Sequence, residues 1–364
     1  MEITDVDCFT LHLPIDRTVG DSRLAVTDLY CVVVEIETDA GLTGTGWMNS
    51  LGFGPDLMER FVESQFVDLL VGRDPFATEA IRRDLRAQTI YYGELGLSMW
   101  PRGAIDVALW DIKAQAAGEP LYRFLGGDVD RVRAYASSMD AHHDVAELGA
   151  LHGGFMDEGF TAFKTKVGDK TPAEEAARIE AIREAIGREA DLFVDANQAW
   201  TVTEAIETVG AMADHGIDWV EEPIAEFDLA GHARVAANIE PPLATGEMFN
   251  RPEQFDRLLE NGGLEVCQPD LIRAGGVTGT WHAAQLAADH HIPLATHFYY
   301  TVNAHIVAAA PTGFVVEYIP EYDVGPVLEP SPTIEDGHVV LLDRPGHGYR
   351  IDPDAKATHR VTFD

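Results

Sequence analysis

The sequence predicts an α/β protein, in which a smaller unit of mixed strands and helices precedes a closed barrel of alternating strands and helices. Two observations support this prediction. From residue 132 onward, eight short apolar stretches recur, separated by amphipathic helical patterns. Before them, an alternating strand pattern gives way to helical periods. Eight parallel strands, each followed by a helix, are the number that closes a βα barrel.

The first 127 residues are expected to form the smaller unit. A strong strand pattern over 29–37, a turn and a returning strand over 42–47 predict a β-hairpin. Helical periods follow, and over 104–117 the apolar residues recur every three or four positions on one face. The pair Gly126 and Gly127 ends this unit.

The predicted barrel occupies residues 128–320. Its last strand is followed by a short hairpin-like end instead of an eighth full helix. We therefore expect residues 321–364 to return to the first unit. The barrel strands are expected at 132–137, 162–167, 192–195, 219–221, 242–246, 265–268, 293–296 and 314–317.

The composition restricts the partners and the location of the protein. Its 364 residues carry 26 basic and 61 acidic side chains, a formal net charge of −35, while 46% hydrophobic residues exclude a disordered chain. This charge disfavours nucleic acid and membrane partners. No apolar run could span a membrane and no signal peptide is recognisable, so a cytoplasmic location is expected. Because only five residues are lysines and salt would screen the self-repulsion, we predict a halophilic origin; an acidic mesophilic protein is the alternative.

Acidic residues stand at the ends of three consecutive predicted strands. Asp195, Glu221 and Glu247 are each 26 residues apart, which is one βα repeat. Side chains at the carboxyl ends of neighbouring barrel strands meet at the same rim. Three carboxylates at one point need a cation, and an all-oxygen set suits a hard ion such as Mg²⁺. Chance is the alternative, since acidic residues are abundant in this chain.

Two candidate bases flank these acids. Lys164 and Lys166, two residues apart on a strand, point to the same side, where a neighbouring metal and ammonium would favour a basic amine. A solvated surface pair is the alternative, although lysine is rare in this chain. On the opposite side, Asp270 would bond one ring nitrogen of His297 and raise the basicity of the other. A structural histidine is the alternative for this position.

These groups predict removal of a proton next to a carboxylate. Glu317 ends the last strand and, when protonated, would donate to a developing oxyanion, whereas Glu222 should point away from the site. The resulting enediolate would be stabilised by the metal, Lys164 and Glu317. Reprotonation from the other face gives racemisation or epimerisation, loss of a β-hydroxyl with acid from His297 gives dehydration, and internal capture gives cycloisomerisation.

Together these motifs resemble the enolase superfamily, and within it the mandelate racemase subgroup. The resemblance covers essentially the whole chain, including the segment 103–127. It implies a (β/α)₇β modified TIM barrel under an α+β capping domain built from the N-terminal segment and the C-terminal tail. It also implies Mg²⁺ on the three acids, Lys166 and the His297 dyad as bases, Lys164 neutralising the substrate carboxylate, Asn197 near the substrate, and assembly as a homo-oligomer. Muconate cycloisomerases are less similar, since they carry lysine where the dyad stands.

Capping-domain loops set specificity in this family, and here they would lie near 15–26 and 48–55. Arg23 and Asn49 are candidates to contact the substrate, with a surface cation as the alternative for Arg23. The loops are polar and rich in glycine, without a run of large apolar residues. Since acid-sugar dehydratases dominate the subgroup, we predict dehydration of an aldonate or aldarate to a 2-keto-3-deoxy acid. Racemisation or epimerisation of a 2-hydroxy acid, cycloisomerisation of a sugar lactone and a non-catalytic binding protein are the alternatives.

Overall fold

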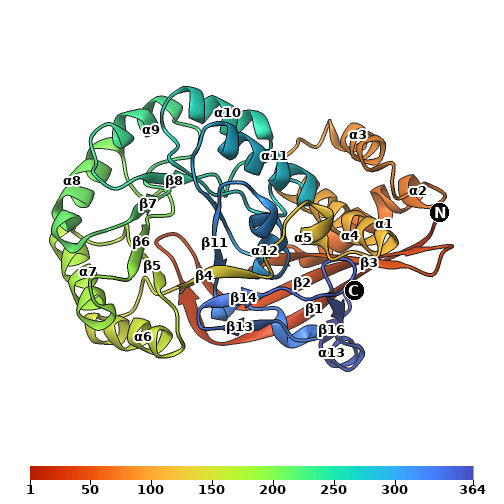
Figure 1. Cartoon of the computed structure of the whole chain (residues 1–364), viewed down its shortest axis with the longest axis horizontal. Helices are drawn as coiled ribbons and strands as arrows, with labels where there is room; N and C mark the ends of the chain where they lie inside the picture. The colour runs from red at the N-terminus through yellow and green to blue at the C-terminus, as the bar shows by residue number, and fades with distance from the viewer. Residues whose placement is uncertain (364) are drawn as a thin grey trace.

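The computed structural model describes residues 1–363, and an eight-stranded parallel barrel forms its larger part (Figure 1). The strands join in sequence order, and the last pairs with the first through Val316 and Ala134, which closes the barrel as predicted. The strands are β4 (Arg131–Ser137), β5 (Ala162–Lys166), β6 (Asp191–Asp195), β7 (Trp219–Glu221), β8 (Leu243–Thr245), β9 (Val266–Cys267), β10 (Leu294–Thr296) and β11 (Gly313–Tyr318).

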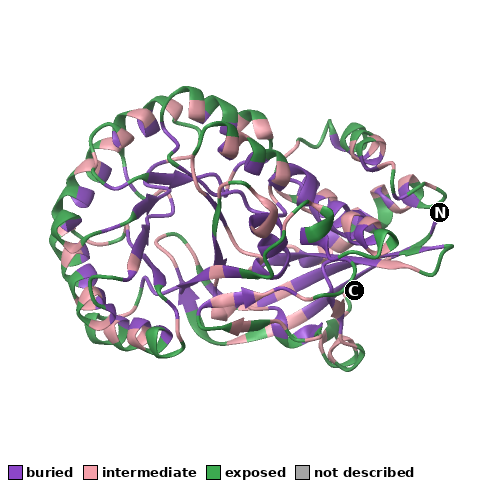
Figure 2. Ribbon diagram, viewed as in Figure 1, coloured by how far each residue is buried: buried purple, intermediate pink, exposed green. Residues whose placement is uncertain are grey.

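Helices surround the barrel, with buried faces toward the strands and exposed faces outward (Figure 2). Two of them begin at Thr171 and Thr201, whose hydroxyls accept the N–H three residues on in capping boxes. No helix within residues 1–363 is long and apolar enough to cross a membrane. The barrel helices are α6 (Val145–Asp157), α7 (Pro172–Ile186), α8 (Val202–Met212), α9 (Leu229–Ala236), α10 (Pro252–Glu260), α11 (Gly276–Asp289) and α12 (Tyr300–Ala309).

The barrel interior is filled by one buried layer of side chains. Tyr135, Phe193 and Trp219 contribute stacked and edge-to-face rings, and smaller alanine and valine side chains complete the layer. Inward-pointing residues alternate along a strand, so the residue two positions after each layer member also points inward, one level higher. On β6 this residue is Asp195, and on β7 it is Glu221. The packed layer therefore forms a floor beneath a ring of polar groups.

The N-terminal unit is an antiparallel sheet covered by helices, and it contains the predicted hairpin. Its glycines Gly44 and Gly46 face the longest helix so closely that a Cβ would overlap the carbonyl oxygens of Ala108 and Ala104, respectively. The elements are β1 (Ile3–Gly20), β2 (Ala25–Thr38), β3 (Thr43–Ser50), α1 (Pro55–Gln65), α2 (Val67–Leu70), α3 (Thr78–Thr89), α4 (Trp100–Ala117) and α5 (Leu121–Phe124).

This close approach makes Gly46→Ala a test of cap packing. We expect the substitution to lower the free energy of unfolding by about 1–3 kcal/mol, because the helix must shift to admit a methyl group. Gly210→Ala is the matched control: Gly210 lies on exposed helix surface with nothing within 4 Å of an added Cβ. Denaturant midpoints measure both effects, and equal stability of Gly46→Ala and wild type would contradict the packing.

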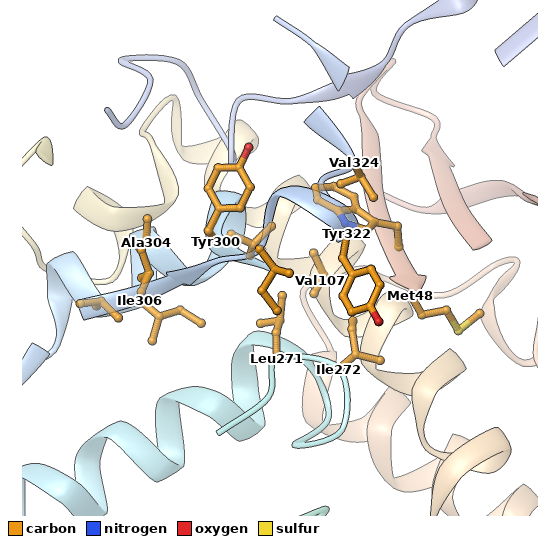
Figure 3. Close-up of a cluster of buried hydrophobic side chains, with 14 of the residues drawn as sticks. Met48, Val107, Leu271, Ile272, Tyr300, Ala304, Ile306, Tyr322 and Val324 are labelled. Atoms are coloured by element: carbon orange, nitrogen blue, oxygen red, sulfur yellow. The ribbon is translucent and has the colours of Figure 1, made fainter. Parts of the chain in front are cut away.

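An apolar contact joins the cap to the barrel. Figure 3 shows Met48 of β3 and Val107 of α4 near Leu271 and Ile272, which follow β9. The turn between β1 and β2 also reaches the barrel, where the Gly20 N–H donates to the Met139 carbonyl at 3.1 Å. The cap is therefore held over the carboxyl ends of the barrel strands.

The C-terminal tail forms a short hairpin over 333–340 and continues beyond it, instead of ending in a hairpin as expected from the sequence. Its first hairpin extends the barrel sheet antiparallel to β4, and its last strand pairs with β1 of the cap. On the tail helix, Lys356 Nζ lies 2.9 Å from Glu35 Oε2 of the cap. The tail therefore contacts both parts. Its elements are β12 (Leu328–Glu329), β13 (Thr333–Glu335), β14 (His338–Val340), β15 (Arg350–Ile351), α13 (Pro353–His359) and β16 (Arg360–Val361).

His305 is fully buried where cap, barrel and tail meet. Its Nδ1 accepts the Tyr122 N–H at 3.2 Å and its Nε2 donates to the His347 carbonyl at 3.2 Å. Both bonds require a neutral ring with its one proton on Nε2. Burial, together with the neighbouring His347 ring, lowers the pKa of His305 to about 3.

This histidine predicts acid sensitivity of the fold. Between the unfolded pKa of ~6.5 and the folded pKa, only the unfolded chain takes up the proton, so stability falls as pH falls. At pH ~4 the loss is on the order of 3 kcal/mol. Unfolding of wild type and His305→Gln at pH ~7 and ~4.5 checks this, and the variant should lose less stability between the two pH values. Equal losses would contradict the assignment.

Candidate active site

Three carboxylates meet above the floor of the barrel. Asp195 and Glu221 end neighbouring strands in register, and Glu247 follows β8. One oxygen of each lies within 4.8 Å of the others, and all three residues are buried. Glu247 Oε2 is buried without a hydrogen-bond partner. An all-oxygen cluster with an unpartnered carboxylate oxygen fits a hard divalent cation.

Both lysines of β5 point into this cluster. Lys164 Nζ lies 2.6 Å from Glu221 Oε1 and 2.7 Å from Glu317 Oε1, and Lys166 Nζ lies 2.6 Å from Asp195 Oδ2. Burial alone would lower the pKa of each lysine, but the adjacent carboxylates outweigh it and raise both pKa values. In this arrangement Asp195 therefore favours the protonated form of Lys166, and the role of Lys166 as a base beside a bound metal stays a prediction. Both side chains are held as ammonium ions.

The predicted dyad is assembled across the barrel. His297 Nδ1 lies 2.8 Å from Asp270 Oδ2, and the other oxygen of Asp270 accepts backbone N–H groups at 2.8 and 2.9 Å. His297 Nε2 lies 3.4 Å from Glu247 Oε2 and is turned toward the cluster. Burial would lower the pKa of His297, but Glu247 and the bond to Asp270 raise it above its usual value.

Two further glutamates differ from expectation. The Lys164 ammonium outweighs burial and lowers the pKa of Glu317 to about 2, so Glu317 is a carboxylate here and not the predicted donor; the donor beside it is Lys164. Glu222 bonds Gln198 Nε2 at 3.1 Å, in agreement with a structural role. However, burial and then Glu247 raise the pKa of Glu222 well above its usual value, so a neutral acid lies near the cluster.

A cavity of about 500 Å³ lies between the barrel and the cap. Lys166, His297, Asn197 and Asn49 line it, whereas Lys164 is fully buried beneath. Arg23 is exposed and does not line it. Arg273 does, with Nη1 3.0 Å from Glu247 Oε1. Arg273 is not among the residues predicted from the sequence; its only signal there is its place three positions after Asp270.

The cap side of the cavity is mostly apolar, and its polar lining side chains are Asp21, Asn49 and Ser50. Its large side chains come from three separate segments, namely the β1–β2 turn, the stretch from β3 into α1, and the entry to α4. The specificity region is therefore less polar than expected from the loop sequences. The loops were misleading because no single segment carries a run of large apolar residues. The apolar cap wall consists of Leu24, Leu51, Phe53, Leu57, Met58, Leu97 and Trp100.

Comparisons with known proteins agree with this geometry. The model of the mandelate racemase/muconate lactonizing enzyme N-terminal domain matches residues 5–126, and that of the enolase C-terminal domain-like family matches residues 148–355. The chain belongs to the mandelate racemase/muconate lactonizing enzyme family. This membership confirms the resemblance found in the sequence, and the cap and barrel are the two parts that the family models describe.

Relatives in this family differ in the reactions they catalyse. The L-talarate/galactarate dehydratase of Salmonella typhimurium is 31% identical, over 97% of this chain and 89% of its own length. The 3,6-anhydro-alpha-L-galactonate cycloisomerase of Streptomyces coelicolor is also 31% identical, over 97% of both chains. A racemase from Streptomyces coelicolor, solved with bound magnesium, has a TM-score of 0.94 at 30% identity and covers 99% of this chain and 100% of its own.

Proposed function

We propose that the protein is a Mg²⁺-dependent sugar-acid dehydratase that removes the proton α to a carboxylate and expels the β-hydroxyl group. The observation that supports this most is that Lys166 and His297 line one cavity from opposite sides, beside the three-carboxylate cluster. The Salmonella typhimurium relative is, by its name, a sugar-acid dehydratase.

Asp195, Glu221 and Glu247 would hold the cation. The Streptomyces coelicolor racemase, which has a similar structure, was solved with bound magnesium. Bound Mg²⁺ would neutralise charge that develops on the substrate carboxylate and weaken the hold of Asp195 on the Lys166 proton. Lys166 can act as a base only after losing that proton, since its amine lone pair must be free.

The residues of this chain then account for each proton. Lys166 takes the α-proton on one side of the substrate, leaving an enediolate. The Lys164 ammonium stabilises the charge on its oxygen. His297, protonated on Nε2 and held by Asp270, donates to the β-hydroxyl group, which leaves as water. The resulting enol takes up a proton at C3 to give the 2-keto-3-deoxy acid.

Racemisation or epimerisation of a 2-hydroxy acid is the second candidate. One base on each side of the cavity suits proton removal and return from opposite faces. The apolar cap wall also favours this candidate, because it suits a substrate with few hydroxyl groups. Such a substrate has fewer groups that could be eliminated. Cycloisomerisation of a sugar-acid lactone would begin with the same proton removal; the Agrobacterium fabrum D-galactarolactone cycloisomerase, 32% identical over 99% of both chains, is a relative with such a name.

A sugar-acid panel with Mg²⁺ at high KCl concentration tests the proposal. Keto acid is read as its semicarbazone by absorbance, and α-deuteration is read by mass spectrometry from the same samples in D₂O. We expect keto acid from one stereochemical set. Deuteration without keto acid would select racemisation or epimerisation, and no signal in either measurement would refute both.

We also propose that the protein acts as a homo-oligomer on a small carboxylate substrate. The net charge of −35 is the basis for excluding nucleic acid and membrane surfaces as partners. Light scattering coupled to size exclusion measures the assembly directly, and a monomeric mass at working concentrations would refute it.

A further inference from the structure

Every basic side chain that lines the catalytic cavity, among the residues described, already bonds a carboxylate of the protein. Lys166 pairs with Asp195 at 2.6 Å, and His297 with Asp270 at 2.8 Å. Arg273 pairs with Glu247 at 3.0 Å. All three groups lie on the barrel side. They can serve the carboxylate and hydroxyl groups nearest the cluster, but none is free for a second carboxylate farther away.

The cap side of the cavity carries no compensating cation in the described chain. Its one charged lining residue there is Asp21. The Asp21 carboxylate accepts the N–H groups of Arg23 and Leu24 at 2.6 and 2.8 Å, which fixes it at the β1–β2 turn. The Arg23 side chain is outside the cavity wall. An anionic group at this end would meet a like charge and, among the described lining residues, no cation.

The apolar cap wall instead offers surface that gains from being covered. Phe53, Leu57 and Leu97 are 64%, 50% and 41% exposed although they line the cavity. Covering such side chains with apolar substrate atoms is favourable, while desolvating a carboxylate against them without a partner is costly. The barrel side of the cavity therefore suits the charged end of a substrate, and the cap side suits an uncharged, apolar end.

We propose that the substrate is a 2,3-dihydroxy monocarboxylic acid whose far end is uncharged and poor in hydroxyl groups, and that a second carboxylate at that end is rejected. The inference rests on the proposed function, which places the reacting carboxylate at the three-carboxylate cluster. It separates this chain from its dehydratase relative, because talarate and galactarate are dicarboxylates. The apolar cap wall and Asp21 are the specificity-determining groups.

Three ligands of the same configuration test the proposal: an aldarate, the aldonate and its terminally deoxygenated analogue. Calorimetry with the Mg²⁺-loaded protein measures binding, and α-proton exchange in D₂O measures reaction, in each of several configurations. We expect affinity to rise about tenfold from aldarate to aldonate, and further for the deoxy acid. An aldarate that binds as tightly as the deoxy acid, or no binding in any series, would overturn the inference.

If the three ligands bind in the expected order but no α-proton exchanges, the inference is supported and the proposed function is refuted. Leu57→Arg supplies the missing cation and should improve aldarate binding relative to the aldonate by about tenfold. Leu95→Arg is the matched control, because Leu95 is exposed but does not line the cavity. An equal gain in the two variants would show that net charge, and not the cavity, sets the preference.

Discussion

His297→Asn is expected to abolish keto-acid formation, with a loss of about 10²–10⁴-fold, while α-proton exchange persists. The imidazole is the group placed to protonate the leaving hydroxyl, whereas Lys166, on the other side of the cavity, removes the α-proton. The two reactions therefore separate only if each side has its own role. Keto acid and deuterium incorporation should be measured in the same samples.

Asp270→Asn completes this experiment. Its carboxylate fixes the proton on His297 Nδ1, so the variant should retain the ring but lose the correct tautomer and the part of the raised pKa that Asp270 adds to that of Glu247. We expect keto-acid formation to fall and its pH profile to shift toward acid, with exchange again spared. If His297→Asn removes exchange and dehydration equally, the roles of the two bases are wrongly assigned.

Glu221→Gln is expected to weaken Mg²⁺ binding by about a hundredfold or more and to abolish activity at ordinary Mg²⁺ concentrations. The substitution keeps the volume of the side chain and replaces one of the three carboxyl groups of the cluster with an amide, which cannot become an anionic ligand. It also leaves Lys164 without the carboxylate at 2.6 Å, which adds positive charge where the cation should lie. Titration calorimetry with Mg²⁺ measures the effect, and circular dichroism checks the fold.

Glu222→Gln is the matched control one residue away. Glu222 is equally buried and bonds Gln198, but it is not one of the three clustered carboxylates. Because Glu222 lies outside the cluster, the amide should change Mg²⁺ affinity by less than about tenfold. Equal losses in the two variants would mean that the cation takes a ligand set other than Asp195, Glu221 and Glu247.

Much of the fold could be predicted because barrel packing repeats along the chain. The eight strands were expected within a few residues of their observed ends, since each is a short apolar stretch between polar segments. The tail could not be predicted in this way. Its strands are only two or three residues long, and two of them, β16 and β14, pair with β1 and β4, far away in the sequence. Such short segments are defined by their partners rather than by their own pattern.

The functional site also has a part that could be predicted from the sequence and a part that could not. Residues fixed by strand alternation, such as Asp195 and Glu221, meet as predicted. Their charge states were harder to predict, because Glu317 and Lys166 depend on which oxygens lie within 3 Å of each ammonium. The apolar cap wall was missed because Leu24, Phe53 and Leu97 belong to separate segments. Composition within one loop carries no information about such a surface.

The pairing of β16 with β1 also makes the cap depend on a distant part of the chain. Leu11 of β1 has Arg360 as its register partner, on the far side of the whole barrel in the sequence. Without that partner β1 is an open sheet edge, and Glu35 lacks its bond to Lys356. The barrel can therefore close before the cap sheet has its fourth strand. The cap is completed only when the segment that follows the barrel has folded back onto β1.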